Sequence, residues 1–283
     1  WALVAAEVAM ALVLLAGAGL LVRSLWSLDG VDLGYRAASV SVGELKLYGP
    51  KWNNDAIRQF TGRLVDEAKS LPGVESAAVA WPPLGRVLTW SPSVTVDPQD
   101  GKPGREGIVQ ATSVSPEFFR TLGITVLRGR VFAPGDQPAT PHVAVVNQEF
   151  ARIFFAGENA VGRKLKMQGV AGPNQWAEIV GVVSNARRFG PAVKPAAEVY
   201  WAFAQNPIYG PALLLRGGPD GSEAALRNLL KPHPGVVLHR WDRFDNLMSA
   251  TTDRWKFTRT LLASFALLAL TLAAIGVYGV ISY

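Results

Sequence analysis

The sequence predicts an α+β domain that is held between two transmembrane helices. Two observations support this prediction: an apolar run at each end of the chain, and a strand–helix–strand pattern that occurs twice between the runs. The 283 residues are 49% hydrophobic and only 18% charged, and the apolar excess lies at the two ends. The roughly 230 residues between the runs are ample for one or two packed domains.

The first apolar run, residues 2–22, reads ALVAAEVAMALVLLAGAGLLV and contains a single charge, Glu7. The last one reads TLLASFALLALTLAAIGVYGVISY and contains no charge. Each run exceeds the roughly 20 residues that a helix needs to cross the hydrocarbon core. Neither run shows the polar face of a helix buried in a protein core. We therefore predict transmembrane helices over residues 1–24 and 260–283.

The flanks of these runs predict a fragment with two helical stalks. No basic segment precedes the first run and no small-residue cleavage site follows it, which argues against a signal peptide. Because the chain begins with Trp1 rather than Met, we expect a piece of a longer protein.

Helical periodicity continues past both runs, which predicts a stalk and linker over residues 25–38 and a second stalk over residues 251–259. Trp26 is a suitable anchor at the membrane interface.

Two features inside the predicted spans leave alternatives open. Glu7 could lie near the cytoplasmic interface, where its cost is small, or face another helix as a polar contact. Ala269, Ala273 and Gly276 form a small-residue face that suits close helix packing, but such a face occurs in any multi-span fold.

Residues 39–85 contain the first strand–helix–strand unit. Alternation in the opening strand slips at Gly43-Glu44, where a β-bulge would fit. Apolar residues from Ile57 to Leu71 then recur on one helix face, and Asn53 or Asn54 offers the N-cap. A Pro-Gly pair ends the helix before the second strand.

Residues 207–250 repeat this order. A strand over residues 212–216 leads into a helix, and Asp220 with Glu223 forms a capping-box pattern at its start. A second Pro-Gly pair precedes the closing strand, residues 236–241. Because both units have the same order, we predict that they form one split α+β sheet.

Residues 86–206 are predicted to be a β-rich insertion between the two halves. The segment is rich in Gly and Pro, and short strand patterns occur at residues 93–96, 108–113, 124–128, 143–147, 178–183 and 198–202. Ser115 is expected to cap a short helix that Pro116 begins and Gly123 closes. Asn147 is expected to cap another helix.

No catalytic, cofactor-binding or metal site is expected. The chain has no Cys, and His142, His233 and His239 share no metal-ligand spacing, so each is interpreted as a surface or strand-end residue. No G-x-S-x-G elbow is present. Short basic clusters such as Arg187-Arg188 are interpreted as solvated loops, and no basic and aromatic stripe indicates nucleic acid. The protein is therefore not expected to be an enzyme.

Residues 157–164 have the spacing of a phosphate loop without its chemistry. Arg163 stands where the motif requires Lys, and Lys164 stands where a Ser or Thr would bind magnesium. We interpret this stretch as a turn, so ATP would have to be bound by a separate subunit.

The patterns together resemble MacB/FtsX-type ABC transporter permeases, and among them the duplicated-permease branch. AGAGLLVRSLWSLDGVDLGY is similar to the exit of the span before a MacB-like periplasmic core domain. LLASFALLALTLAAIGVYGVISY resembles the start of the FtsX-like membrane domain. The recurrent motifs of the core domain are matched, in order, by residues 70–80, 114–132, 143–165, 179–190 and 198–205.

This resemblance implies a fold and a setting for the chain. Residues 39–85 and 207–250 would form a porter-like subdomain, with residues 86–206 as the second, β-rich subdomain inserted. The domain would lie on the periplasmic side of the bacterial cytoplasmic (inner) membrane, between spans that contact the lipid bilayer. The implied partners are a cytoplasmic ATP-binding ABC subunit and other permease spans or a second permease half, and the resemblance leaves room for a periplasmic partner protein.

Because the helical period continues past both apolar runs, we hypothesise mechanical coupling of ATP hydrolysis in the separate subunit to motion of the extracytoplasmic domain. The resemblance suggests that this motion serves export or envelope work. The alternative is a two-span receptor with an extracytoplasmic sensor domain. An anchored envelope hydrolase has weak support, because the sequence offers no nucleophile or acid pair. The sequence that follows Tyr283 would discriminate: further spans indicate a permease, and an amphipathic linker with a kinase or cyclase domain indicates a receptor.

Overall fold

The computed structural model describes residues 31–36, 38–82, 90–98, 104–156, 158–168, 175–190, 193–218 and 222–248, and short helical pieces within residues 9–23 and 260–278. The chain divides into two compact units, of which Leu33–Met248 is one and the two chain ends together are the other. Most of the predicted spans, and residues 25–30 and 251–259 of the predicted stalks, lie outside the described residues. Among the residues that are described, no helix is both long and apolar enough to cross a membrane.

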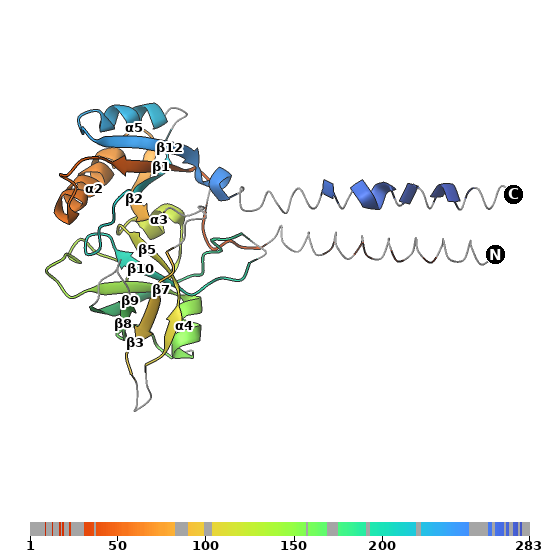
Figure 1. Ribbon diagram of the computed structural model, residues 1–283, viewed down its shortest axis with the longest axis horizontal. Coiled ribbons are helices and arrows are strands. Elements are labelled where there is room, and N and C mark those ends of the chain that lie inside the picture. The colour runs from red at the N-terminus through yellow and green to blue at the C-terminus, as the bar shows by residue number, and fades with distance from the viewer. Residues whose placement is uncertain are drawn as a thin grey trace. The chain divides into compact units, whose positions relative to one another are not determined.

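One mixed sheet extends through the unit Leu33–Met248, in the order β12-β1-β11-β2-β5-β10-β7-β9-β8-β3-β4, with β6 also paired to β9 (Figure 1). Its strands are β1 (Val40–Leu47), β2 (Val74–Trp81), β3 (Ser93–Val96), β4 (Glu106–Ile108), β5 (Gln110–Val114), β6 (Val126–Gly129), β7 (Val143–Asn147), β8 (Lys164–Gln168), β9 (Trp176–Val183), β10 (Glu198–Ala202), β11 (Ala212–Gly217) and β12 (Val236–Arg243). The helices are α2 (Asn54–Lys69), α3 (Phe118–Leu122), α4 (Gln148–Phe155) and α5 (Ser222–Leu230).

The two predicted halves form one antiparallel sheet in the order β12-β1-β11-β2. Helix α2 joins β1 to β2 and helix α5 joins β11 to β12, so each half interleaves with the other, as the repeat predicted. Both helices pack on one face of this sheet, where Phe60, Leu64 and Leu226 are buried (Figure 1). The side chain of Asn53 accepts a hydrogen bond from the Ala56 amide, which confirms this N-cap.

The predicted bulge lies in a different strand. Glu44 pairs with Arg240 and Leu45 pairs with Leu238, so the extra residue is His239 of β12 and not a residue of β1. The alternation in β1 slips because both faces of the strand are covered: Val40 and Val42 point into one core cluster, and Leu45 and Leu47 into another.

The segment between the halves contributes the strands from β3 to β10, and helix α4 covers one face of them (Figure 1). Phe150 and Phe154 of α4 stack at 4.3 Å between ring centroids in a cluster with Leu165 and Trp201. The Asn147 side chain accepts a hydrogen bond from the Phe150 amide, which confirms the second predicted cap. Strand β8 was not predicted, because its Lys-Leu-Lys-Met-Gln alternation is short and directly follows a loop.

The cap predicted at Ser115 is wrong. The Ser115 hydroxyl accepts a hydrogen bond from the Val79 amide at 3.1 Å, and the Ser115 amide donates to the Val79 carbonyl at 2.9 Å. This residue therefore ties α3 to β2 instead of capping the helix. Gly123 closes α3 in the left-handed conformation, with φ +69°, as predicted.

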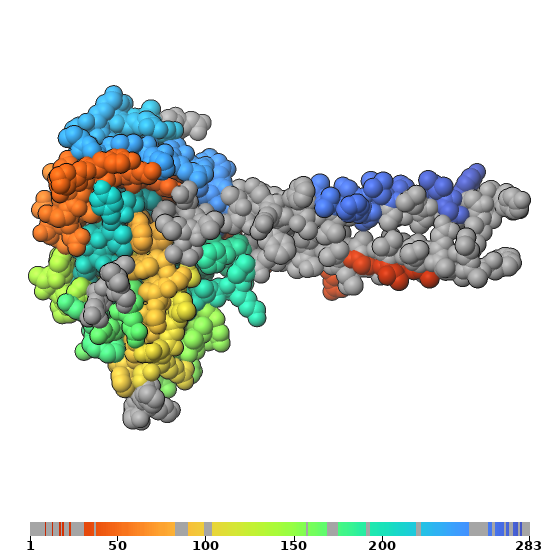
Figure 2. Space-filling model, in the orientation of Figure 1, coloured from red at the N-terminus to blue at the C-terminus, as the bar shows by residue number. Residues whose placement is uncertain are grey.

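The two halves of the sheet and the inserted strands pack directly against each other (Figure 2). Strand β2 joins β5 through only two residue pairs, at Ala80 and Trp81. A core cluster crosses this seam, since it contains Ala80 and Leu214 of the split sheet together with Phe118 and Tyr200 of the insertion. The subdomain boundaries at residues 39–85, 86–206 and 207–250 stay predictions.

Candidate functional site

The segments that lead into and out of the unit Leu33–Met248 meet in its core. We call residues 33–36 the incoming segment and residues 244–248 the outgoing segment; the outgoing segment is one helical turn that follows β12. The rings of Tyr35 and Phe244 lie edge to face, with 5.4 Å between centroids. Leu247 and Met248 are buried in the same cluster. The two segments therefore share one buried contact.

Loops and helix α3 hold the incoming segment from two sides. The Arg36 amide donates to the Leu122 carbonyl at 2.7 Å, and the Arg187 amide donates to the Leu33 carbonyl at 2.8 Å. Gly34 has φ +75°, and a Cβ there would lie 1.8 Å from the Asn185 carbonyl oxygen. Only glycine fits this position.

The Arg216 guanidinium joins three parts of the fold at this place. From β11 it donates to the carbonyl oxygens of Arg36 at 2.7 Å, Ala38 at 3.3 Å and Thr121 at 2.7 Å. The fixed fork of guanidinium donors suits several acceptors at once. The incoming segment, α3 and the split sheet are therefore connected through a single side chain.

A buried polar network supports the loop behind the incoming segment. Arg188 donates to Glu198 at 3.1 Å and to the Thr112 hydroxyl at 2.6 Å, with the Arg188 and Glu198 side chains only 3% and 2% exposed. The Tyr200 hydroxyl donates to the other Glu198 oxygen. Burial and the Glu198 charge raise the pKa of Tyr200 well above its ordinary value, so this phenol stays a donor.

Arg188 corrects the interpretation of Arg187-Arg188 as a solvated basic cluster. Arg187 touches the incoming segment through its backbone, whereas the Arg188 side chain is inside the core. The sequence offered little signal for this, because the acceptors of Arg188 lie ten and 76 residues away in the chain. Arg216 and Asn185 were missed for the same reason. The glycine at position 34, just before Tyr35, was the one local hint of a constrained segment.

The Tyr35 hydroxyl, unlike the buried polar groups described above, is unsatisfied. It is buried and has no hydrogen-bond partner among the described residues. Burial raises the pKa of Tyr35, so the group remains neutral.

The residues considered for chemistry lie apart from this site and from each other. His142 is half-buried before β7, His233 packs its ring edge on Phe60 with 5.2 Å between centroids, and His239 is exposed. The described part of residues 157–164 is a loop that leads into strand β8 and not into the helix that a phosphate loop requires. Within the described ranges, no group of three or more His, Cys, Asp or Glu residues could hold a metal ion.

Comparison with protein families gives this fold its context. Residues 5–211 match the family described as the MacB-like periplasmic core domain. The chain belongs to this family. The resemblance to MacB-type ABC transporter permeases is thereby confirmed, and the chain is the MacB-like periplasmic domain of an ABC transporter permease. The family is a transporter permease domain and not a catalytic enzyme.

Two solved structures are similar to this MacB-like domain. One is the periplasmic region of MacB from Actinobacillus actinomycetemcomitans, at 13% identity and a TM-score of 0.49, covering 77% of this chain and 94% of that one. The other is the extracellular domain of the ABC-type transporter YknZ from Gram-positive bacteria, at 13% identity and a TM-score of 0.44, covering 70% of this chain and 100% of that one. A search of curated proteins finds no match.

Proposed function

We propose that this MacB-like chain couples ATP hydrolysis, performed by a separate cytoplasmic ABC subunit, to motion of its extracytoplasmic domain. The predicted spans over residues 1–24 and 260–283 would hold it in the bacterial inner membrane, beside other permease spans or a second permease half. The output would be export or other work on the envelope, with a periplasmic partner protein as a further participant.

The contact between the incoming and outgoing segments carries this proposal. Transmission of a displacement requires a stiff connection, because a flexible linker changes its own conformation instead of moving the domain. Tyr35 and Phe244 pack ring against ring, and Arg216 fixes the incoming segment to the sheet. Both ends of the domain are therefore bound to one core cluster, which supports movement of the domain as one body.

The test inserts Gly-Gly after Ser27 and after Lys256 in the full-length permease, reconstituted with its ATPase partner in liposomes. We expect ATP turnover to persist while transport is lost, because the added glycines break the stiff path between membrane and domain. The matched control inserts Gly-Gly after Pro138, which lies in an exposed turn. Unchanged transport after the insertions at Ser27 and Lys256 would overturn the proposal.

The family match favours this function over a two-span receptor. A receptor would respond to ligand without a partner ATPase, so dependence of domain motion on ATP also separates the two.

A further inference from the structure

Basic side chains surround the incoming segment on the outside of the fold. Arg36 is the last residue of that segment and is exposed. Arg187 is half-buried, and its amide donates to the Leu33 carbonyl at 2.8 Å. Lys194 is exposed, and its neighbour Val193 is 42% exposed although it is apolar. We call Arg36, Arg187, Val193 and Lys194 the basic surface.

Hydrogen bonds hold the basic surface next to the incoming segment. The Arg187 guanidinium donates to the Val193 carbonyl at 3.0 Å, which ties the two ends of the loop between them. Leu33 and Arg36 are three residues apart, so the two arginines are attached to the incoming segment within about 11 Å of each other. The fold therefore fixes where these basic residues lie.

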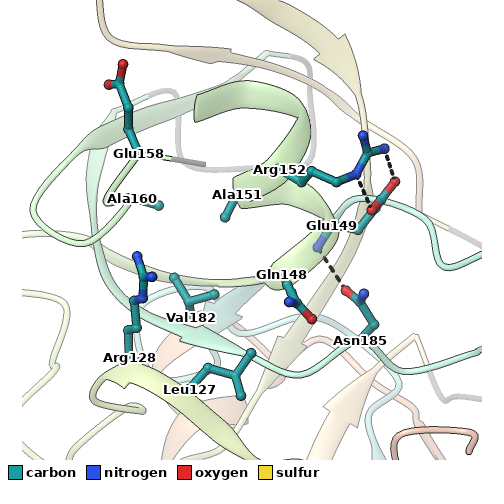
Figure 3. A pocket seen from close by; sticks show the side chains of 10 residues that line it. All are labelled: Leu127, Arg128, Gln148, Glu149, Ala151, Arg152, Glu158, Ala160, Val182 and Asn185. Atoms are coloured by element: carbon teal, nitrogen blue, oxygen red, sulfur yellow. Dashed lines mark hydrogen bonds and ion pairs between the residues drawn. The ribbon is translucent and has the colours of Figure 1, made fainter. Parts of the chain in front are cut away.

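The basic surface carries an excess of positive charge, because neighbouring carboxylates are bound to other arginines. Both carboxylate oxygens of Glu149 accept hydrogen bonds from Arg152, at 2.8 and 2.6 Å, as Figure 3 shows. Asp245 is paired with Arg243 at 3.2 Å. The exposed Asp32 offsets one of the three cations of the basic surface. Positive charge beside an exposed apolar side chain suits an anionic and partly apolar partner.

The chain length limits the distance between the basic surface and the bilayer. Leu33 follows the predicted span over residues 1–24 by nine residues, and Met248 precedes the predicted span over residues 260–283 by twelve. As a helix, nine residues extend about 14 Å. The headgroup layer takes up roughly 5–8 Å of this length, which leaves roughly 6–9 Å. Because the Debye length is about 8 Å at physiological ionic strength, an anionic membrane surface attracts cations at this distance.

We propose that the basic surface binds the headgroups of anionic phospholipids in the membrane that anchors the chain. Phosphate oxygens would accept charge-assisted hydrogen bonds from Arg36, Arg187 and Lys194. Val193 would be removed from water at the headgroup layer. Such binding would hold the incoming segment in one position relative to the bilayer surface. The inference rests on the membrane placement of the proposed function, and it adds a lipid class to it.

The test places the full chain in nanodiscs of phosphatidylcholine, alone or with about 30% phosphatidylglycerol as the anionic lipid. Because the chain has no Cys, Val193→Cys gives a single site for an NBD dye, which becomes brighter when it leaves water. We expect brighter emission in the nanodiscs that contain phosphatidylglycerol. The difference should disappear in about 1 M salt, where the Debye length is about 3 Å.

Charge variants of the labelled chain assign the effect to the basic surface. Arg36→Gln combined with Lys194→Gln removes two cations. Each cation near an anionic surface strengthens binding about fivefold, so the equilibrium constant of the contact should fall about 25-fold. Arg36→Lys combined with Lys194→Arg keeps both charges and should keep the brightening, which a purely structural role of these side chains would not predict. Arg63→Gln, at an exposed position of α2, is the matched control.

Equal emission in the two kinds of nanodisc would refute the inference. Brightening that persists in the double Gln variant would refute it as well, because another part of the chain would then bind the lipid. Neither result affects the coupling proposal, since transport and ATP turnover are not measured. A chain that fails to enter the nanodiscs would contradict both proposals, because both require the predicted spans.

Discussion

At the residue scale, the Tyr35 ring packs against Phe244, but its buried hydroxyl makes no hydrogen bond with any described residue. We expect Tyr35→Phe to keep or slightly raise the free energy of unfolding, because an unpaired buried polar group costs about 1–3 kcal/mol. Tyr35→Ala should lower it by about 3–5 kcal/mol, because the ring contact with Phe244 is lost and a cavity remains. Urea denaturation of both variants checks this. A clear loss of stability in Tyr35→Phe would mean that the hydroxyl has a partner outside the described residues.

Asp136 gives a prediction for acid stability. Burial alone would raise the pKa of its carboxyl above 3.8, but the pKa is lowered, because hydrogen bonds from Arg130 at 2.7 and 2.9 Å and from the Ala133 amide at 2.8 Å outweigh burial. A lowered pKa contributes stability that is present above pH 3.8 and is lost as the pH falls through the folded-state pKa.

Asp136→Asn should therefore be less stable than the parent at pH 7, and the difference should shrink as the pH falls below 4. Unfolding measured between pH 7 and pH 2.5 checks this, with the exposed Asp66→Asn as control. A difference that stays constant down to pH 2.5 would argue against the Arg130 contact.

At the element scale, the incoming segment lies outside the regular elements and is held on two sides by backbone hydrogen bonds. Gly34→Ala should destabilise the domain by more than about 1 kcal/mol, because the added Cβ meets the Asn185 carbonyl in a left-handed conformation. Hydrogen exchange should speed up at the amides of Arg36 and Arg187 first. Gly135→Ala is the control, since a Cβ there meets nothing within 4 Å. Unchanged exchange at Arg36 would show that the segment is not held as described.

The elements also show which features the sequence could predict. The Asn53 and Asn147 caps and the left-handed Gly123 were predictable, because each depends on residues within one helical turn. The position of the bulge was not, because His239 and Glu44 are neighbours only after the strands pair. Ser115 has the sequence of a cap, but its hydroxyl satisfies the Val79 amide of a distant strand. Tertiary hydrogen bonds took precedence over local propensity in both cases.

At the scale of the whole molecule, the repeated strand–helix–strand order predicted the split sheet, but nothing in it predicted how the insertion joins that sheet. Helix α3 packs on β2 and β11 on the face opposite α2 and α5. The insertion thereby completes the core of the sheet that it interrupts. The candidate site depends on this arrangement, since Arg216 of the sheet reaches Thr121 of α3.

This shared core predicts that the unit Leu33–Met248 unfolds as one body. Phe118→Ala removes a fully buried ring of α3 and should cost about 3–5 kcal/mol. Because Phe118 shares its cluster with Val42 of β1 and Leu214 of β11, hydrogen exchange should rise by a similar factor in the split sheet and in β7 and β9. Faster exchange confined to residues 86–206 would instead mean two independent subdomains. If the junction between β2 and β5 opened, the domain would deform instead of moving when its incoming segment is displaced. Mechanical coupling through this fold therefore requires that the whole unit respond cooperatively.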